Sequence, residues 1–370
     1  MFKHTSDILK DQGINRSTLV IFEGRARANI KRLGNRAAGC CVTMRPHFKT
    51  HQSETVAGWF ADEGIDRITV SSLDMAVRFA TAGWRDITIA FLLNPLERPR
   101  LLDLASRLAA RKGRLGCTID STAAAEALRT TGTVPPVDVW LKIDTGYGRT
   151  GIPWDDRPLL RAVVGALTVP PRGLLTHAGH GYRARSRKAL RKIWDETVAR
   201  MQAARTILER NDLMLSVGDT PTCSVVEDYS GVDEIRPGNF VFYDLMQLQI
   251  GSCGPDDLAA AVACPVVGIY PDRRQVVIHG GAVHLSKESL QETGGRIFGR
   301  PGLLDPPRIL DGARVTGLSQ EHGVITFADG AFPAAHELSI GDLMLVWPVH
   351  SCLATDLLTV RPAPSVAFIP

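Results

Sequence analysis

Residues 45–51 read Arg-Pro-His-Phe-Lys-Thr-His and directly follow an apolar run, Gly39–Met44, with the composition of a core strand. Lysine is a strongly hydrated point charge, and it is most useful at the end of such a strand when its amine is desolvated and nucleophilic. Lys49 lies between two histidines and four residues after Arg45. This crowding of cations favours a neutral amine that can form a Schiff base with an aldehyde cofactor. A solvated loop lysine is the alternative that the stretch alone leaves open.

Strand-like runs of the same kind recur from about residue 25 to residue 245 and alternate with segments of helical spacing, such as 101–111 and 186–208. In order, the runs are Gly39–Met44, Arg67–Ser71, Ile87–Leu93, Leu115–Asp120, Val137–Asp144, Arg172–His177, Leu213–Asp219 and Glu234–Tyr243. Eight β/α units predict an α/β fold, a (β/α)₈ TIM-type barrel. Two parallel-sheet domains are the competing layout, but eight units fill one barrel without remainder.

The sequence pattern changes after residue 250, where long segments of helical spacing largely disappear. Short apolar runs, among them 261–270, 275–279 and 343–346, alternate there with turn signals. The segment Thr18–Glu23 has the same character. We therefore expect a barrel over residues 25–245, and a smaller β-rich domain formed by residues 1–24 together with residues 246–370.

The composition excludes several classes of protein. The 370 residues carry a formal net charge of +4 with both signs interspersed, so no nucleic-acid or anionic-membrane surface is indicated. No apolar stretch reaches the roughly 18 residues that span a bilayer, and Met1–Gly13 has no apolar core like that of a signal peptide. The seven cysteines are scattered and odd in number, which favours reduced thiols and a cytoplasmic location.

Polar motifs recur where the predicted barrel strands end, which is where working residues of such barrels lie. They contain Lys49 after the first strand, Arg149 after the fifth, His177 and Tyr182 after the sixth, Thr220 after the seventh, and Gly238 with Asn239 in the last strand segment. Any one of these motifs could be ordinary turn chemistry. Their shared placement predicts a site at this end of the barrel.

Each motif suits one part of a phosphorylated, planar cofactor. The loop around Thr220 and the pair Gly238-Asn239 can offer backbone N–H groups and a hydroxyl to a phosphate. The fork of Arg149 suits a phenolate or carboxylate, with an ion pair to Asp144 as the alternative. His177 can stack on a ring and Tyr182 can bond a ring nitrogen; a strand-end histidine and an interface tyrosine are the alternatives. With Lys49, these groups describe a pyridoxal phosphate (PLP) site.

The β-rich domain contains a possible metal pair in Pro348-Val349-His350-Ser351-Cys352. On an extended segment residues two apart face the same side, so His350 and Cys352 can reach one ion. Imidazole with thiolate favours Zn²⁺ over the harder Mn²⁺ or Mg²⁺. Two ligands make a weak motif, and a buried cysteine beside an unrelated histidine is the alternative. Glu321 and His322 could form a pair that supports such a site or handles protons. The alternative is a surface turn.

Taken together, these motifs resemble one known family. Arg-Pro-His-x-Lys-Thr-His at 45–51, Lys-Ile-Asp-x-Gly-x-x-Arg-x-Gly at 142–151, His-Ala-Gly-His at 177–180, Gly-Asp-Thr-Pro-Thr at 218–222, Glu-x-Arg-Pro-Gly-Asn at 234–239, Glu-His-Gly at 321–323 and Pro-x-His-x-Cys at 348–352 are similar to those of the metal-dependent D-serine dehydratase and D-threonine aldolase group. That group has the alanine-racemase type of PLP fold, a barrel followed by a β domain. The resemblance covers nearly the whole chain, in matching order.

The resemblance implies a role for each matching residue. Lys49 matches the Schiff-base lysine and α-proton base, and the other matches are Arg149 beside the phenolic oxygen, His177 and Tyr182 at the ring, Thr220, Gly238 and Asn239 at the phosphate, and His350 with Cys352 at the metal. Dehydratases of the group place His and Cys at the metal pair, whereas the aldolases tend to place His and Asp. Cys352 therefore favours zinc and dehydration, with Mn²⁺ or Mg²⁺ as alternatives. The resemblance also implies a homodimer.

The expected function is a PLP- and zinc-dependent lyase that removes water from a D-3-hydroxy amino acid and yields a 2-oxo acid and ammonia. Aldol cleavage to glycine and an aldehyde uses the same parts, and racemisation would need an acid or base on the opposite face. A non-catalytic PLP carrier is the alternative hypothesis outside the class of enzymes, but such proteins resemble the barrel alone. One departure from the family pattern, Ile278-His279-Gly280-Gly281 in place of an Asp-Ala-Gly type sequence, leaves the substrate open.

Overall fold

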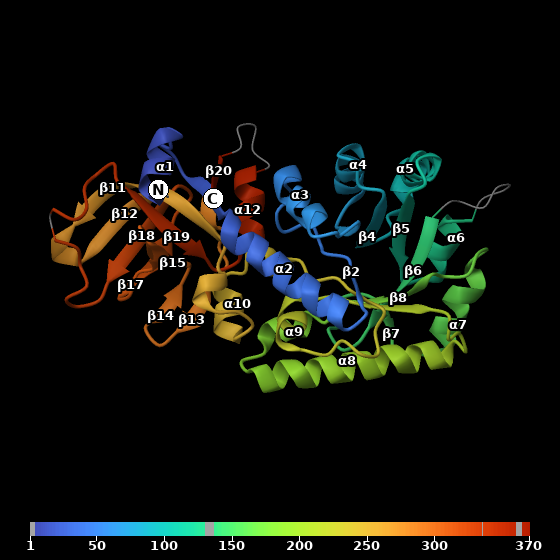
Figure 1. Ribbon diagram of the computed structural model, residues 1–370. Coiled ribbons are helices and arrows are strands. Elements are labelled where there is room, and N and C mark those ends of the chain that lie inside the picture. Colours follow the sequence, from blue (N-terminus) through green and yellow to red (C-terminus); the bar gives the residue numbers. More distant parts are fainter. Residues whose placement is uncertain (1–3, 130–136, 335, 360–364) are drawn as a thin grey trace. The chain divides into compact units, whose positions relative to one another are not determined.

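The computed structural model describes residues 4–129, 137–334, 336–359 and 365–370 (Figure 1). The chain divides into two compact units, one formed by residues 30–238 and the other by residues 1–29 together with 239–370. Within the described ranges, no helix combines the length and the apolar character needed to cross a membrane.

The unit 30–238 is built on eight parallel strands, in the order β2-β10-β9-β8-β6-β5-β4-β3, with the short β7 (Ile152–Pro153) paired to β6. The strands are β2 (Thr43–Met44), β3 (Arg67–Val70), β4 (Asp86–Leu92), β5 (Arg114–Ile119), β6 (Val137–Asp144), β8 (Gly173–Thr176), β9 (Met214–Val217) and β10 (Glu234–Ile235). A parallel bridge between His47 and Thr69 joins the two ends of this order, and the Phe48 N–H donates to the Thr69 carbonyl at 2.9 Å. The sheet is therefore closed, and the predicted TIM-type barrel is confirmed.

A helix precedes the first barrel strand and further helices lie between the strands along the chain; Figure 1 shows them around the strands. They are α2 (Glu23–Gly39), α3 (Glu54–Asp62), α4 (Leu73–Thr81), α5 (Arg98–Ala110), α6 (Thr122–Ala127), α7 (Arg157–Ala166), α8 (Arg187–Ile207) and α9 (Thr220–Val225). Four of them start after a serine whose hydroxyl accepts a backbone N–H of the first turn: Ser53, Ser72, Ser121 and Ser186. Such caps fix where a helix begins, and so how long the preceding strand-end loop can be.

The first and last predicted barrel strands are much shorter than expected. In Gly39–Met44, helix α2 continues to Gly39, and Cys41 takes a left-handed backbone (φ 56°) before two residues pair as β2. In Glu234–Tyr243, only Glu234–Ile235 pair as β10, and Asn239–Val241 form a 3₁₀ turn. Pro237 has no N–H to continue the ladder, although its carbonyl still accepts the N–H of His47 at 2.9 Å.

A buried polar chain crosses the inside of the barrel. Arg45 is 2% exposed, and its guanidinium bonds Glu234 (Nε to Oε2, 2.6 Å) and Asp86 (Nη1 to Oδ1, 2.5 Å). The Ser216 hydroxyl donates to the other Glu234 oxygen at 2.6 Å and accepts from Arg236 Nε at 2.7 Å. A buried ion pair is tolerated when its remaining donors and acceptors are satisfied, as they are here. These hydrogen bonds and ion pairs hold the segment that leads from β2 to Lys49 in place.

The other unit is a largely antiparallel sheet in the order β12-β18-β17-β15-β19-β11-β1-β20, with β16 on β15 and a further pairing of β12 with β11. Its strands are β1 (Thr18–Phe22), β11 (Ala260–Tyr270), β12 (Gln275–His279), β15 (Gly299–Leu304), β16 (Pro307–Ile309), β17 (Ala313–Leu318), β18 (His322–Phe327), β19 (Leu343–Pro348) and β20 (Val366–Ile369), with a separate hairpin of β13 (Leu290–Glu292) and β14 (Gly295–Ile297). Four helices accompany them: α1 (Thr5–Asp11), α10 (Leu245–Ile250), α11 (Ala282–Leu285) and α12 (Ser351–Thr359). The predicted strand at Thr18–Glu23 belongs to this sheet as β1.

Candidate functional site

Lys49 lies exposed in the turn that follows β2, at the carboxyl end of the barrel strands. Its backbone N–H donates to Nδ1 of His47 at 3.3 Å, so the neutral imidazole of His47 carries its proton on Nε2. Burial, followed by the charges of Lys49 and Arg236, holds the pKa of His47 well below its ordinary value. A neutral histidine therefore shapes the turn that presents the lysine.

The loop after β6 is shaped by Asp144, whose Oδ1 accepts the N–H groups of Gly146 and Tyr147, each at 2.9 Å, and of Gly148 at 3.1 Å. Asp144 is thus a loop-forming residue, and no ion pair joins it to Arg149 in the described residues. The Arg149 guanidinium instead lies over the ring of Tyr147, 5.0 Å from its centroid. Arg149 is exposed at the same barrel end as Lys49.

His177 follows β8, and its Nδ1 lies 2.6 Å from the carbonyl oxygen of Gly218. A carbonyl only accepts, so Nδ1 carries the proton and Nε2 keeps a lone pair. Burial, together with the charges of Lys142 and Lys49, keeps the pKa of His177 well below its usual range. The rings of Tyr147 and Tyr182 have centroids 5.8 and 6.3 Å from the imidazole. The site thus contains a neutral, planar ring suited to stacking.

The loops after β9 and β10 approach each other closely. The Thr220 hydroxyl, at the start of α9, accepts the N–H of Gly238 at 3.3 Å. A Cβ on Gly238 would lie 2.8 Å from the His47 carbonyl oxygen, and a Cβ on Gly218 would lie 2.8 Å from the Cβ of Arg236. Side chains are excluded at both glycines, which leaves a lining of backbone and one hydroxyl. This is the kind of cradle that backbone N–H groups offer to a phosphate.

Lys142 on β6 belongs to the same group, although the sequence analysis did not single it out as a site residue. It is 6% exposed, and burial, then the charges of Arg236 and Arg149, lowers the pKa of its ammonium to about 7. The signal was a lysine inside the predicted strand run 137–144. Four cationic side chains therefore act on one another here: Lys49, Lys142, Arg149 and Arg236. Such a donor set fits an anionic, phosphate-bearing cofactor.

A second group of polar residues lies in the other unit and centres on Asp244, the N-cap of α10. Its Oδ2 accepts from Nδ1 of His350 at 2.9 Å, from the backbone N–H of Ser351 at 3.0 Å and from Nδ2 of Asn239 at 2.7 Å. A carboxylate on Nδ1 fixes the tautomer and leaves Nε2 of His350 to bind a metal. Asp244 was not among the predicted site residues; its signal was a helix-capping pattern, Asp three residues before Gln247, whose N–H donates to Oδ1 at 2.9 Å.

His350 and Cys352 come together, but not on an extended segment as we expected. Strand β19 ends at Pro348, and helix α12 begins at Ser351, so Cys352 lies in its first turn. The two side chains are nevertheless hydrogen-bonded to each other. Burial alone would lower the pKa of His350, but Cys352 and Asp244 raise it well above the ordinary value. The imidazole and the cysteine sulfur are therefore adjacent, as a zinc site requires.

The structure places the side chain of Asn239 in this second group. Its Nδ2 donates to the Ser351 hydroxyl at 2.8 Å and lies 3.6 Å from Sγ of Cys352, while its buried Oδ1 has no partner among the described residues. The contact of Asn239 with a phosphate stays a prediction.

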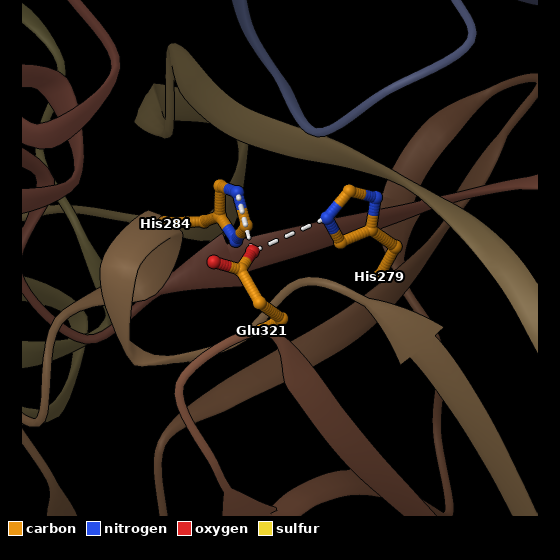
Figure 2. Close-up of side chains that lie close together, drawn as sticks. All are labelled: His279, His284 and Glu321. Atoms are coloured by element: carbon orange, nitrogen blue, oxygen red, sulfur yellow. Dashed lines mark hydrogen bonds and ion pairs between the residues drawn. The ribbon is translucent and has the colours of Figure 1, made fainter. Parts of the chain in front are cut away.

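Glu321 lies between His279 and His284 (Figure 2), neither of which was predicted as a site residue. A supporting or proton-handling role of Glu321 with His322 stays a prediction.

Two domain models match the chain. The alanine racemase N-terminal domain matches residues 22–245, and the putative serine dehydratase domain matches residues 259–362. The chain is 34% identical over 348 residues to D-threo-3-hydroxyaspartate dehydratase of Delftia sp. (strain HT23), covering 90% of each chain. It is 25% identical over 379 residues to D-serine dehydratase of Dictyostelium discoideum, covering 93% of this chain and 92% of the other.

Solved structures agree with these matches. The structure of the Delftia enzyme has a TM-score of 0.86 at 32% identity and covers 96% of this chain and 95% of its own. A variant of that enzyme with a cysteine replaced by alanine has been solved in a metal-free form. D-threonine aldolase from Filomicrobium marinum, at 22% identity with a TM-score of 0.74 and coverage of 92% and 89%, shares the fold. The chain therefore belongs to the family of lyases in which an alanine-racemase-type N-terminal domain is followed by a serine dehydratase domain.

Proposed function

We propose that this protein is a PLP- and zinc-dependent dehydratase that converts D-3-hydroxy amino acids to 2-oxo acids and ammonia. The observation that carries the proposal is the adjacent pair of His350 and Cys352, with Nδ1 of His350 on Asp244. The names of the relatives, D-threo-3-hydroxyaspartate dehydratase and D-serine dehydratase, support the same reaction class.

The barrel residues fit PLP. Lys49 would bind the aldehyde carbon, Arg149 the phenolic oxygen, and the backbone at Gly238 with the Thr220 hydroxyl would hold the phosphate. PLP, when bound, supplies an electron-withdrawing ring that stabilises negative charge at Cα of an amino acid. His177 is neutral with Nδ1–H on Gly218, so it offers a flat ring without adding a charge.

Lys49 is the residue that would move the proton. Its side chain is exposed at the barrel end, and the neutral His47 fixes its backbone N–H. In its neutral form, Nζ of Lys49 can take the proton from Cα of the substrate.

The pair in the other unit fits a metal. Nε2 of His350 and Sγ of Cys352 would be its protein ligands, and Asp244 holds the imidazole in the required tautomer. A zinc ion there supplies a Lewis acid that makes the β-hydroxyl a better leaving group. Loss of the α-proton and the β-hydroxyl releases water, and hydrolysis of the remaining C–N bond gives the 2-oxo acid and ammonia.

Turnover of the PLP-loaded enzyme on D-serine, D-threonine and D-threo-3-hydroxyaspartate tests the proposal, with ammonia, 2-oxo acid and aldehyde assayed in parallel before and after chelation. Ammonia with an equal amount of 2-oxo acid, lost on chelation and restored by Zn²⁺, is the expected result. Glycine with an aldehyde would overturn it in favour of an aldolase. Bound PLP without turnover on any substrate would identify a carrier.

Two variants locate the metal contribution. Cys352→Ala should abolish dehydration while the PLP content is unchanged, because the residues that would form the PLP cradle remain. Cys40→Ala removes a cysteine whose Sγ lies 3.5 Å from the Glu227 carbonyl and takes no part in either site, so it should keep full turnover. Full turnover in Cys352→Ala would contradict the metal-assisted mechanism.

We also propose that the enzyme is a cytoplasmic homodimer. The scattered cysteines support a reducing compartment, and the family resemblance implies the dimer. Light scattering after size-exclusion chromatography tests the second point; a mass near the 40.2 kDa of a single chain would contradict it.

A further inference from the structure

We propose that His279, His284 and Glu321 form a second zinc site, which uses none of the residues around His350 and Cys352. All three residues belong to the β-rich unit, and one ligand atom from each lies within 4.8 Å of the others. In Figure 2, dashed lines join both imidazoles to the same carboxylate oxygen. Two histidines and a glutamate are a known donor set for zinc, with a fourth position left open.

The distances suit a tetrahedral ion. Nε2 of His279 lies 3.3 Å from Oε2 of Glu321, and Nε2 of His284 lies 3.7 Å from the same oxygen. Ligands about 2.0–2.1 Å from zinc are separated from one another by roughly 3.3–3.4 Å in a tetrahedron. Both separations from Glu321 are therefore within a few tenths of an ångström of the tetrahedral value, and the two imidazole donors lie within 4.8 Å of each other.

The backbone brings the three donors together from separate elements. His279 ends β12, His284 lies on α11, and Glu321 directly precedes β18. The Gly280 N–H donates to the Glu321 carbonyl at 3.0 Å. A Cβ on Gly281 would lie 2.3 Å from the Gln320 carbonyl oxygen, so this approach requires glycine. Backbone packing thus places the three residues next to one another.

The charge and exposure of the cluster also suit a cation. In the described residues, neither lysine nor arginine forms an ion pair with Glu321, so its carboxylate faces only the two imidazoles. The side chain of His284 is 4% exposed, whereas those of His279 and Glu321 are 40% and 47% exposed. One ligand is therefore anchored inside the unit, and the opposite side is open to an incoming ion and to water as the fourth ligand.

One hydrogen bond opposes metal binding. The Gly281 N–H donates to Nδ1 of His284 at 3.2 Å, which places the proton of neutral His284 on Nε2. A metal on Nε2 requires that proton on Nδ1, so the bond from Gly281 must open. We therefore expect this site to bind zinc more weakly than the His350–Cys352 pair. Mg²⁺ should not replace zinc, because two of the three donors are imidazoles.

Metal titration of the metal-free, PLP-loaded enzyme tests the proposal, with bound zinc counted by elemental analysis and Co²⁺ used as a coloured probe. The wild type should bind two equivalents, of which the tighter one gives a thiolate-to-cobalt charge-transfer band from Cys352. Cys352→Ser should lose that band and keep the weaker equivalent, with only the weak d–d bands of a nitrogen and oxygen site.

Variants of His279 or Glu321 should lose the weaker equivalent and keep the tighter one. Glu321→Gln keeps the shape of a half-exposed side chain, and His279→Ala truncates another; each should weaken the second equivalent by more than the roughly 10- to 100-fold that loss of a supporting neighbour costs. Both should keep the thiolate band. His322→Ala is the matched control, because it removes the exposed histidine paired across from His279 and should leave both equivalents.

A single equivalent in the wild type, accompanied by the thiolate band, would overturn the second site. Two equivalents retained at unchanged affinity in Glu321→Gln would do the same. Neither result depends on turnover, and the thiolate band reports the His350–Cys352 pair separately. Failure of this proposal and failure of the proposed function are therefore distinguishable.

Discussion

Lys142 is a buried ammonium inside the barrel, and its surroundings set a definite pH dependence. Burial, followed by Arg236 and Arg149, lowers its pKa to about 7, against an ordinary value of 10.5. Below pH 7 the lysine is charged in both the folded and the unfolded chain, so the folded state bears the full penalty of burying the charge. As the pH rises from 7 towards 10.5, the folded state releases its proton first, and the penalty disappears.

We therefore expect the free energy of unfolding of the cofactor-free protein to rise between pH 7 and pH 10. At 1.36 kcal/mol per pKa unit the gain is at most about 5 kcal/mol. Lys142→Met should flatten this rise, because it removes the titrating group. Urea unfolding at several pH values measures the effect. Lys192→Met, at a side chain that is 77% exposed on α8, should retain the wild-type slope; equal slopes in the two variants would contradict the assignment.

The residues of the site differ in how well they could be predicted from the sequence. Lys49, Arg149, His177 and Thr220 follow strands, so the barrel pattern alone placed them at one end. Lys142 lies within a strand, and its inward direction follows only once the barrel is closed. Asp244 lies far from His350 in the sequence. A capping pattern does not predict that the same carboxylate also accepts a hydrogen bond from a histidine 106 residues later.

Helices α10 and α12 meet at Asp244, which caps the first and accepts the N–H of Ser351 at the start of the second. Asp244→Asn keeps an acceptor for the Gln247 N–H, so α10 should remain capped. It loses the carboxylate that orients His350. We expect metal affinity to fall by about 10- to 100-fold, with the melting temperature little changed. Zinc titration with thermal unfolding measures both, and unchanged zinc affinity would refute the role of the carboxylate.

The short strands β2 and β10 are held by Arg45 as well as by their ladder. Its side chain and that of Glu234 are 2% and 1% exposed, and their ion pair lies inside the barrel. Arg45→Met should destabilise the protein by roughly 3–5 kcal/mol, because it leaves a buried carboxylate without its cation. Adding Glu234→Gln should recover part of this loss. Chemical unfolding of the two single variants and the double variant measures the coupling; strictly additive effects would show that the pair does not act as a unit.

Strand positions followed from composition along most of the chain, but strand ends did not. The runs at 87–93, 115–120 and 137–144 coincide closely with β4, β5 and β6. Those at 39–44 and 234–243 overestimate β2 and β10, because a left-handed Cys41 and the missing N–H of Pro237 limit the pairing. The left-handed turn at Cys41 depends on how the barrel closes, which local propensity does not encode, whereas the proline is already visible in the sequence.

The two ends of the chain contribute to one sheet. Strand β1 pairs antiparallel with β11 and parallel with β20, so residues 18–22 and 366–369 are neighbours although almost the entire chain separates them. The sequence indicated that the first strand belongs to the β-rich domain, since its character matched the runs after residue 250. The partner strands and their register required the complete sheet, because alternation alone does not select among several similar apolar strands.

The distribution of ligands between the two units predicts how cofactor and metal respond to removal. Lys49, Arg149, His177 and Thr220 all belong to residues 30–238, whereas His350 and Cys352 belong to the other unit. Chelation should therefore abolish dehydration and leave the PLP content unchanged, and Zn²⁺ alone should restore turnover. Absorbance of bound PLP, followed together with zinc content during dialysis against a chelator, measures both. Loss of PLP in proportion to zinc would show that the metal holds the cofactor site together, and the separate roles assigned to the two groups would then be wrong.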